Sequence, residues 1–171
     1  MSLPVYKEAH LLTIRRYDER DREAVWLLHN IALQRVGVHL GNGPWDDDLK
    51  QIREVYLDQG GEFLIGQYQN KLVAMGALRK TSEDRAEVKR MRVHPDYQGK
   101  GFGQAIYDQL ENRARDLGYT TLHLDTSIKQ QPAQKLYLKN GFSEVRRGMI
   151  QTLEVIFYEK KLAPFLMTGK P

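Results

Sequence analysis

Three glycines stand at alternate positions just before a helical pattern, and their spacing suggests a site for chemistry. Gly99, Gly101 and Gly103 lie in the stretch HPDYQGKGFGQAI, residues 94–106. Glycine loses more backbone entropy on ordering than other residues, so this spacing indicates positive φ angles or the close approach of a ligand. The free amides and the positive dipole end of a following helix favour an anion such as a phosphate. A tight strand-to-helix turn without a ligand is the alternative.

The spacing of these glycines differs from two common nucleotide-binding motifs. A P-loop requires Ser or Thr after Gly-Lys, whereas Lys100 is followed by Gly101. The dinucleotide fingerprint Gly-x-Gly-x-x-Gly also fails, because Gln104 or Ile106 stands at its last position. The loop therefore suits a pyrophosphate held at a helix N-terminus by backbone amides.

The elements around this loop follow one another without strict alternation. We expect strands at residues 11–16, 62–68, 72–79, 86–93, 120–126 and 153–162, where the sequence is apolar or alternating. Helical spacing predicts helices at residues 19–36, 46–59 and 104–117, and a short one from Pro132 to Gly141. Gln69 and Asn70 are expected to form a hairpin turn. This order predicts an α/β fold with a mixed sheet and helices on both faces.

Length and composition favour one domain and exclude several classes of partner. The 171 residues, 41% of them hydrophobic, are expected to form a single domain, with a core at about 11–162 and a tail at 163–171. Lys plus Arg exceed Asp plus Glu by 26 to 22, but the basic residues are interspersed, so we expect no nucleic-acid groove. We find no apolar run that could span a membrane and no secretory pattern in Met1–His10, and expect a cytoplasmic protein.

The motif Gln98-x-x-Gly101-x-Gly103 resembles the acetyl-coenzyme A site of the GNAT superfamily of N-acetyltransferases, because EVKRMRV precedes it and AQKLYLKNGF follows about 30 residues later. The resemblance covers Leu11–Leu162 in element order, and its most specific part is Glu87–Phe142. It implies a mostly antiparallel sheet of about seven strands, in which residues 86–93 and 120–126 splay apart. It also implies acetyl-CoA as co-substrate, no metal, and a small-molecule or peptide amine as acceptor. Dimers are frequent in this family, so a homodimer is among the expected assemblies.

The resemblance assigns cofactor contacts to the glycine loop and to the strand before it. Backbone amides from Gln98 to Gln104 would hold the pyrophosphate, and the pantetheine arm would lie between the splayed strands. The amide of Met91 falls where the family polarises the thioester carbonyl, and Gln130 stands where the family often has an asparagine. The expected cofactor residues are Met91, Val93, Gln98, Gly99, Lys100, Gly101, Phe102, Gly103, Gln104 and Gln130.

Two side chains match catalytic positions of the family. Tyr137 matches the general acid, since a phenol with a pKa of about 10 is protonated at neutral pH and can give a proton to a thiolate. Glu87 matches the general base of some members, and the two-residue strand period puts it on the same face as Met91, about 13 Å away along a flat strand. Glu87 would therefore need a water relay or a bulge. Asp125, on the opposite strand, is the second candidate base.

Each of these side chains also has a purely structural interpretation. Tyr137 could be a core residue beside Leu136, and Glu87 could pair with Lys89 or Arg90. Asp46, Asp47 and Asp48 could bind a cationic amine or cap a helix, and capping is the preferred interpretation. Trp45 would line the acceptor pocket or pack on that helix. The histidines show no metal-ligand spacing, and no metal site is expected.

The absence of cysteine from the chain limits the mechanism. It excludes an acetyl-cysteine intermediate, and no Ser or Lys has an identifiable activating partner. The expected reaction is therefore direct attack of an amine on acetyl-CoA in a ternary complex. A non-catalytic acyl-CoA sensor or interaction module of the same fold is the alternative, because such a module needs the glycine loop but no acid.

Overall fold

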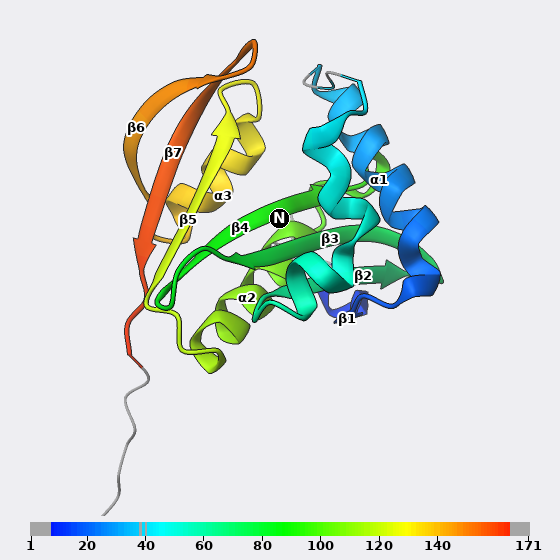
Figure 1. Ribbon diagram of the computed structural model, residues 1–171. Helices are drawn as coiled ribbons and strands as arrows, with labels where there is room; N and C mark the ends of the chain where they lie inside the picture. Colours follow the sequence, from blue (N-terminus) through cyan, green and yellow to red (C-terminus); the bar gives the residue numbers. More distant parts are fainter. Residues whose placement is uncertain (1–7, 38, 40, 165–171) are drawn as a thin grey trace, which may run out of the picture.

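The fold is built on one seven-stranded sheet in the order β1-β2-β3-β4-β5-β7-β6 (Figure 1). The structure is a computed structural model that describes residues 8–37, 39 and 41–164. The strands are β1 Thr13–Arg16, β2 Glu62–Tyr68, β3 Lys71–Lys80, β4 Arg85–Val93, β5 Thr121–Ser127, β6 Ser143–Ile150 and β7 Leu153–Lys161. Neighbouring strands are antiparallel except β4 and β5, which are parallel. The expected mixed, mostly antiparallel sheet is confirmed.

Helices cover both faces of this sheet, as the sequence predicts (Figure 1). One face carries α1 Arg22–Arg35 with the short helices η3 Pro44–Lys50 and η4 Arg53–Leu57, and the other carries α2 Phe102–Asp116 and α3 Gln131–Lys139. Three further short helices are η1 Glu8–Leu11, η2 Glu19–Asp21 and η5 Pro95–Tyr97. A separate hydrophobic cluster fills each interface, with Leu28 and Ile52 in the first, and Ile106 and Leu110 in the second. The sheet is thus held from both sides by buried apolar side chains.

The hairpin between β2 and β3 forms at the residues that the sequence indicates. Gln69 and Asn70 have φ angles of 48° and 63°, the left-handed values of a two-residue turn that matches the twist of the strands. Among the described residues, no helix is both long enough and apolar enough to cross a membrane. Most of the predicted tail, from residue 165 to residue 171, lies outside the described residues. Residues 1–7, where the sequence shows no secretory pattern, also lie outside them.

The predicted helix at 46–59 is two short helices, and its three aspartates do not cap it. Gly43 precedes η3, and no side chain caps the helix, so the capping interpretation is wrong. A 3₁₀ helix repeats every three residues, which puts Asp46 and Leu49 on one side, and both are buried. Asp46 and Asp48 are turned into the protein, where His29 and Arg90 bind them.

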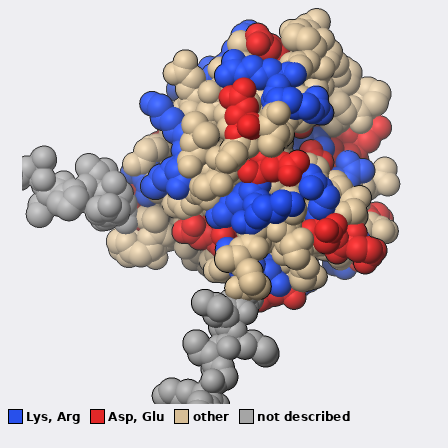
Figure 2. Space-filling view, turned by 90° about the vertical axis from the view of Figure 1, so that its left-hand side faces the viewer, with Lys and Arg blue, Asp and Glu red and all other residues tan. Residues whose placement is uncertain are grey.

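Strand β6 has no counterpart among the segments predicted one by one. It lies at the edge of the sheet, where β7 is its one partner strand among the described residues. Seven of its residues are exposed and Gly148 is half-buried, so it lacks the alternation that marks a strand. Figure 2 looks onto the side of the molecule that carries this edge and shows basic and acidic side chains interspersed there. Pairs such as Arg147 with Glu144 account for part of that mixture.

Candidate active site

The candidate site begins where β4 and β5 separate. The two strands pair only over Arg85–Glu87 and Thr121–His123. Beyond these residues β5 continues to pair with β7, while β4 continues along β3, so the sheet opens between them (Figure 1). The splayed pair that the resemblance implies is therefore present, and within the described residues no strand pairs with the rest of β4 on its β5 side.

A bulge in β4 sets the direction of the residues beside this opening. The register between β3 and β4 shifts around Gly76, and Arg90 has a left-handed φ of 58°. Met91 packs on the α2 side, where its Sδ would lie 2.5 Å from a Cβ on Gly76. The glycine therefore leaves room for the Met91 side chain, as is common at bulges.

The same bulge corrects one expectation about Glu87. Val88 is buried in the cluster on the α2 side, and Met91 packs against that cluster. Because the bulge adds a residue, Met91 shares a face with Val88, and the expectation that it shares one with Glu87 is wrong. Glu87 lies outside that cluster and lines a cavity, with its Oε1 3.8 Å from Nζ of Lys89.

The glycine loop presents backbone rather than side chains. Gly99 and Gly101 have φ angles of +77° and +84°, which explains why these two positions are glycine. The first backbone hydrogen bond into α2 runs from Ala105 N to Gly101 O, so the amides of Phe102, Gly103 and Gln104 precede the helical ladder. A Cβ on Gly103 would be 3.6 Å from Val93, an ordinary contact, so packing alone does not require glycine there.

The polar side chains of the loop are mostly engaged elsewhere. Lys100 binds Glu8 at 2.7 Å and does not line the cavity beside the loop. Gln104 exchanges hydrogen bonds with Asn140 at 2.8 and 2.9 Å. Lys135 and Lys139 of α3 do line that cavity, and the sequence prediction missed them. Their spacing of four residues puts both on one face of the helix, and this spacing could have indicated a basic surface beside the loop.

Two cavities meet at the end of β4. The first has a volume of about 290 Å³ and is lined by β4, β5 and the chain between α1 and η3, and the second has about 380 Å³ and is lined by the glycine loop and α3. Five residues line both cavities, namely Met91, Arg92, Gln130, Ala133 and Tyr137. The predicted residues Val93, Gln98, Gly99, Gly101, Phe102, Gly103 and Gln104 all line the second cavity.

Tyr137 is a buried phenol at this junction. Its side chain is 4% exposed and packs edge-on against Phe142. Burial raises its pKa above the ordinary value of a phenol, although the charge of Arg92 opposes this shift. Its hydroxyl makes no hydrogen bond to any residue in the described part of the chain. The phenol therefore stays protonated at neutral pH and is free to donate to a ligand.

The two candidate bases lie together in the first cavity. Glu87 and Asp125 line it from β4 and β5 respectively. Asp125 is exposed to solvent within the cavity. The surrounding protein partly desolvates its carboxylate, and this desolvation, followed by the negative charge of Glu87, raises the pKa of Asp125. Two neighbouring carboxylates of this kind are suited to holding a proton or a cationic group.

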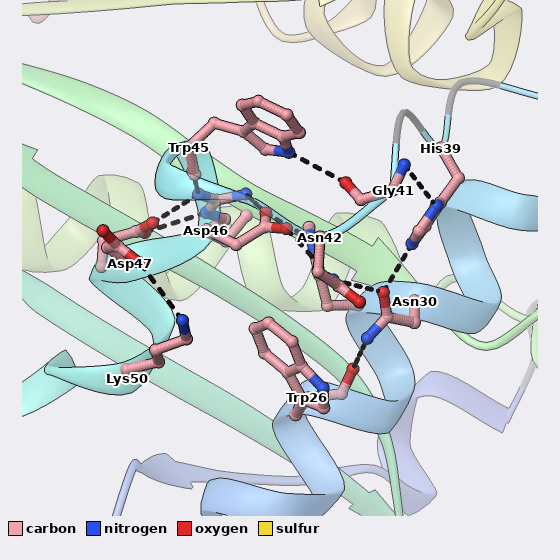
Figure 3. A network of polar contacts seen from close by, with 12 residues as sticks. Trp26, Asn30, His39, Gly41, Asn42, Trp45, Asp46, Asp47 and Lys50 are labelled. Atoms are coloured by element: carbon pink, nitrogen blue, oxygen red, sulfur yellow. Dashed lines mark hydrogen bonds and ion pairs between the residues drawn. The ribbon is translucent and has the colours of Figure 1, made fainter.

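A hydrogen-bond network fixes the wall of the first cavity between α1 and η3 (Figure 3). Asn30 joins the wall to α1, since its Oδ1 accepts from Asn42 at 2.8 Å and lies 2.6 Å from Nε2 of His39. Trp45 lines the cavity and donates to Gly41 O at 3.1 Å, and its role in holding an acceptor stays a prediction. This wall is therefore held by α1 rather than by packing alone.

Buried charges lie beneath this wall. His29 Nε2 is 2.8 Å from Asp46 Oδ1, and burial, followed by the charges of Arg92 and Arg90, lowers the pKa of His29 to about 4. Arg90 donates to Asp48 Oδ2 at 2.9 Å and to Trp45 O at 2.7 Å. Among the described residues, no group of His, Asp and Glu is placed to hold a metal ion.

Comparison with known proteins shows what the chain is similar to. The model of the acetyltransferase (GNAT) family matches residues 17–142. N-acetyltransferase 8F1 of Rattus norvegicus is 29% identical over 118 residues, 61% of this chain and 53% of that protein, so the chain spans about half of that relative. [Ribosomal protein bS18]-alanine N-acetyltransferase of Escherichia coli K12 is 32% identical over 100 residues, 57% of this chain and 68% of that protein.

A solved structure extends this likeness over most of the fold. The PaiA N-acetyltransferase from Thermoplasma acidophilum, in complex with coenzyme A, has a TM-score of 0.71 and 16% identity. The match covers 88% of this chain and 99% of that one. At this identity the likeness shows the fold alone.

Proposed function

The chain belongs to the acetyltransferase (GNAT) family, and we propose that it is an N-acetyltransferase that moves an acetyl group from acetyl-CoA to a primary amine by direct attack. The observation that carries the proposal is the junction of two cavities at Met91 and Tyr137. One cavity has the features of an anion site, and the other has carboxylates suited to an amine. Two substrates can therefore meet at one point in a ternary complex.

Acetyl-CoA would lie in the second cavity. The amides of Phe102, Gly103 and Gln104 and the positive end of the α2 dipole would hold its pyrophosphate. Lys135 and Lys139, which line the same cavity, would add positive charge. The unpaired side of β4 would hydrogen-bond the pantetheine arm, with Gln130 beside it, and would bring the thioester to Met91. The coenzyme A bound to the PaiA N-acetyltransferase, which has the same fold, supports this use of the cavity.

The chemistry requires one bond to form and one to break. The neutral amine nitrogen attacks the thioester carbonyl carbon, and the backbone amide of Met91 stabilises the developing oxyanion. The C–S bond then breaks, and Tyr137 gives its proton to the departing thiolate. The amine loses a proton to solvent or to a base, and Tyr137 is reprotonated from solvent.

Removal of the amine proton accounts for the carboxylates of the first cavity. An alkylamine with a pKa of about 10.4 costs roughly 4 to 5 kcal/mol to deprotonate at neutral pH. Glu87 and Asp125 are the candidate bases, and each would act through water. The raised pKa of Asp125 brings it nearer to neutral pH, which favours proton transfer.

The test of this proposal is an initial-rate study in which both substrates are varied. Direct attack in a ternary complex gives double-reciprocal plots that intersect, because no product leaves before both substrates are bound. Parallel lines would indicate an acetylated enzyme and would contradict the proposed mechanism.

Gly103→Ala is expected to strengthen the fold and weaken cofactor binding. Alanine in the helix should raise the free energy of unfolding of the ligand-free protein by about 0.5–1 kcal/mol, since its Cβ makes ordinary contacts. The same methyl group would occupy the space of a pyrophosphate at the amides, so coenzyme A affinity should fall about tenfold, or roughly 1.4 kcal/mol. Urea denaturation and calorimetry measure the two quantities separately.

A fall of both quantities together would mean that Gly103 is needed for folding rather than for the ligand. Gly148→Ala, on the exposed edge strand, is the matched control. Its Cβ would also make only ordinary contacts, and it lies in neither cavity, so coenzyme A affinity should stay at the wild-type value.

A further inference from the structure

Arg92 is a cation in the wall of both cavities that the proposed chemistry does not use. It follows Met91 directly in β4, and its Nη1 donates to Met91 O at 2.8 Å. Its Nε is fully buried and has no acceptor. Within the described part of the chain Arg92 makes no other hydrogen bond and no ion pair. The guanidinium therefore has no ion-pair partner among the described residues, although the negative charge of Asp46 acts on it from a greater distance.

The neighbouring arginine shows how different this situation is. Arg90 is bound by both oxygens of Asp48 and lies 3.6 Å from Asp46. Asp46 is in turn shared with His29 and Asn42. The carboxylates beneath this wall are thus already bound by other residues, and none of them forms an ion pair with Arg92.

An unpaired charge of this kind is costly to keep. Burial, together with the charge of Arg90, lowers the pKa of Arg92 to about 10, but the group is still a cation at neutral pH. Arg92 as a residue is half-buried, but its Nε is fully enclosed. A charge enclosed without an ion pair destabilises a fold, and a neutral side chain of similar size would avoid that cost. An anion that enters the cavity would supply the missing partner and would be bound more strongly than in water.

The position of Arg92 indicates which substrate carries the anion. The phosphates of acetyl-CoA would lie at the other end of the second cavity, beside the N-terminus of α2. Arg92 instead lies at the junction, held against the backbone of Met91, where the amine must attack. Arg92 and the expected position of the thioester are close together. A small acceptor that binds Arg92 with an anionic group and attacks the thioester with its amine must therefore carry the two groups only a few bonds apart.

We propose that Arg92 binds a carboxylate of the acceptor, so that the acceptor is a free amino acid whose carboxylate lies a few bonds from the amine. This inference rests on the N-acetyltransferase activity proposed above. The first cavity, of about 290 Å³, is of a size for such a molecule. Glu87 and Asp125 in the same cavity would face the amine through water, and the side chain of the acceptor would fill the rest of the space.

The experiment compares each common L-amino acid with its carboxamide as acceptor. Wild-type protein is expected to prefer the free carboxylate by about 10- to 100-fold in kcat/KM, the range of a buried hydrogen bond to a charged group. Arg92→Gln should abolish that preference and leave the Kd for coenzyme A unchanged. Lys89→Gln is the control, because Lys89 is another cation of the first cavity, and its preference should equal that of the wild type.

The outcomes separate this inference from the activity on which it rests. Acetylation of amino acids and carboxamides at equal rates would overturn the role of Arg92 and leave the N-acetyltransferase activity intact. Equal losses for all amines in Arg92→Gln, with the preference retained, would also overturn it, because Arg92 would then act on the thioester. No acetylation of any amine, including peptides, would instead contradict the proposed function itself.

Stability gives a second readout that does not depend on activity. Because Arg92 has no ion pair to lose, the melting temperature of ligand-free Arg92→Gln should equal or exceed that of the wild type. A marked fall would mean that the guanidinium is compensated within the protein, which would overturn the premise. Arg92→Lys keeps the charge without the planar donors and should retain part of the carboxylate preference.

Discussion

Tyr137→Phe is expected to lower kcat by a factor of about 100 or more, the usual contribution of a positioned general acid. The substitution removes only the hydroxyl, which makes no hydrogen bond within the described chain, so the fold should not change. The affinity for coenzyme A should also stay the same, because the amides that hold the pyrophosphate are untouched. Steady-state rates and calorimetric titration with coenzyme A measure the two effects.

The control for this substitution is Tyr158→Phe. Tyr158 is buried, its ring lies 6.4 Å from that of Tyr137, and it lines neither cavity. Loss of the Tyr158 hydroxyl should leave kcat unchanged. Equal rates for wild type and Tyr137→Phe would show that Tyr137 is a core residue only.

The pH dependence of the wild type follows from the same phenol. Burial raises the pKa of Tyr137, so the proton that it donates stays in place well above neutral pH. The rate should rise with pH as the amine loses its proton, and no loss of activity from Tyr137 is expected below about pH 10. A fall in kcat near neutral pH would contradict this assignment of the acid.

Asp48→Asn is expected to lower the free energy of unfolding by about 3–5 kcal/mol, the cost of breaking a buried ion pair. The side chain of Asp48 is 11% exposed and binds Arg90 and the hydroxyl of Tyr56. Asparagine has nearly the same shape but removes the carboxylate that binds Arg90 with both oxygens, so that the remaining counter-charge, Asp46, lies 3.6 Å away. That arginine sits at the bulge with a left-handed φ, so the change should also loosen β4 beside Met91. Urea denaturation at neutral pH measures the effect.

The adjacent aspartate is a matched control for this prediction. Asp47 is 56% exposed and pairs with Lys50 at 3.2 Å, so Asp47→Asn should change stability by less than about 1 kcal/mol. Similar effects at both positions would mean that the Asp48–Arg90 pair does not stabilise the bulge.

The cost of Asp48→Asn should itself depend on pH. Burial raises the pKa of Asp48, but the hydrogen bonds and charge of Arg90 outweigh it, and the net pKa lies below the ordinary value. A carboxyl with a depressed pKa stabilises the fold fully above its unfolded pKa of about 3.9 and loses that contribution as the pH falls further. The difference between wild type and Asp48→Asn should therefore shrink below about pH 4.

Much of this site could be predicted from the sequence because its signals are local. The alternate glycines, the helix that follows them and the hairpin at Gln69 and Asn70 depend on neighbours in the chain, and the structure has them where expected. The seven-stranded sheet with one splayed pair came from the resemblance to a family, and the structure confirms it. The roles assigned to Tyr137, Glu87 and Met91 stay predictions, although their side chains line the junction or the cavity beside it.

The remaining features depend on contacts between distant residues. Nothing near Arg90 in the chain predicts a bulge, because Gly76 on the next strand and Asp48 on η3 together allow it. The sequence also led to the wrong interpretation of Asp46 and Asp48 as helix caps, because their partners His29 and Arg90 are far away in sequence. Strand β6 has no buried face, and its sequence therefore lacks the alternation of apolar and polar residues that predicts a strand. The lack of an ion-pair partner for Arg92 can be recognised only in the structure, where the residues around it are known.

The most direct test of the proposed activity is thiol release from acetyl-CoA, measured with and without a panel of amines, with the acylated product identified by mass spectrometry. We expect release that depends on an amine, and one N-acetylated product for each thiol. Tight binding of coenzyme A with no release above spontaneous hydrolysis for any amine would contradict it, and would indicate an acyl-CoA sensor of the same fold.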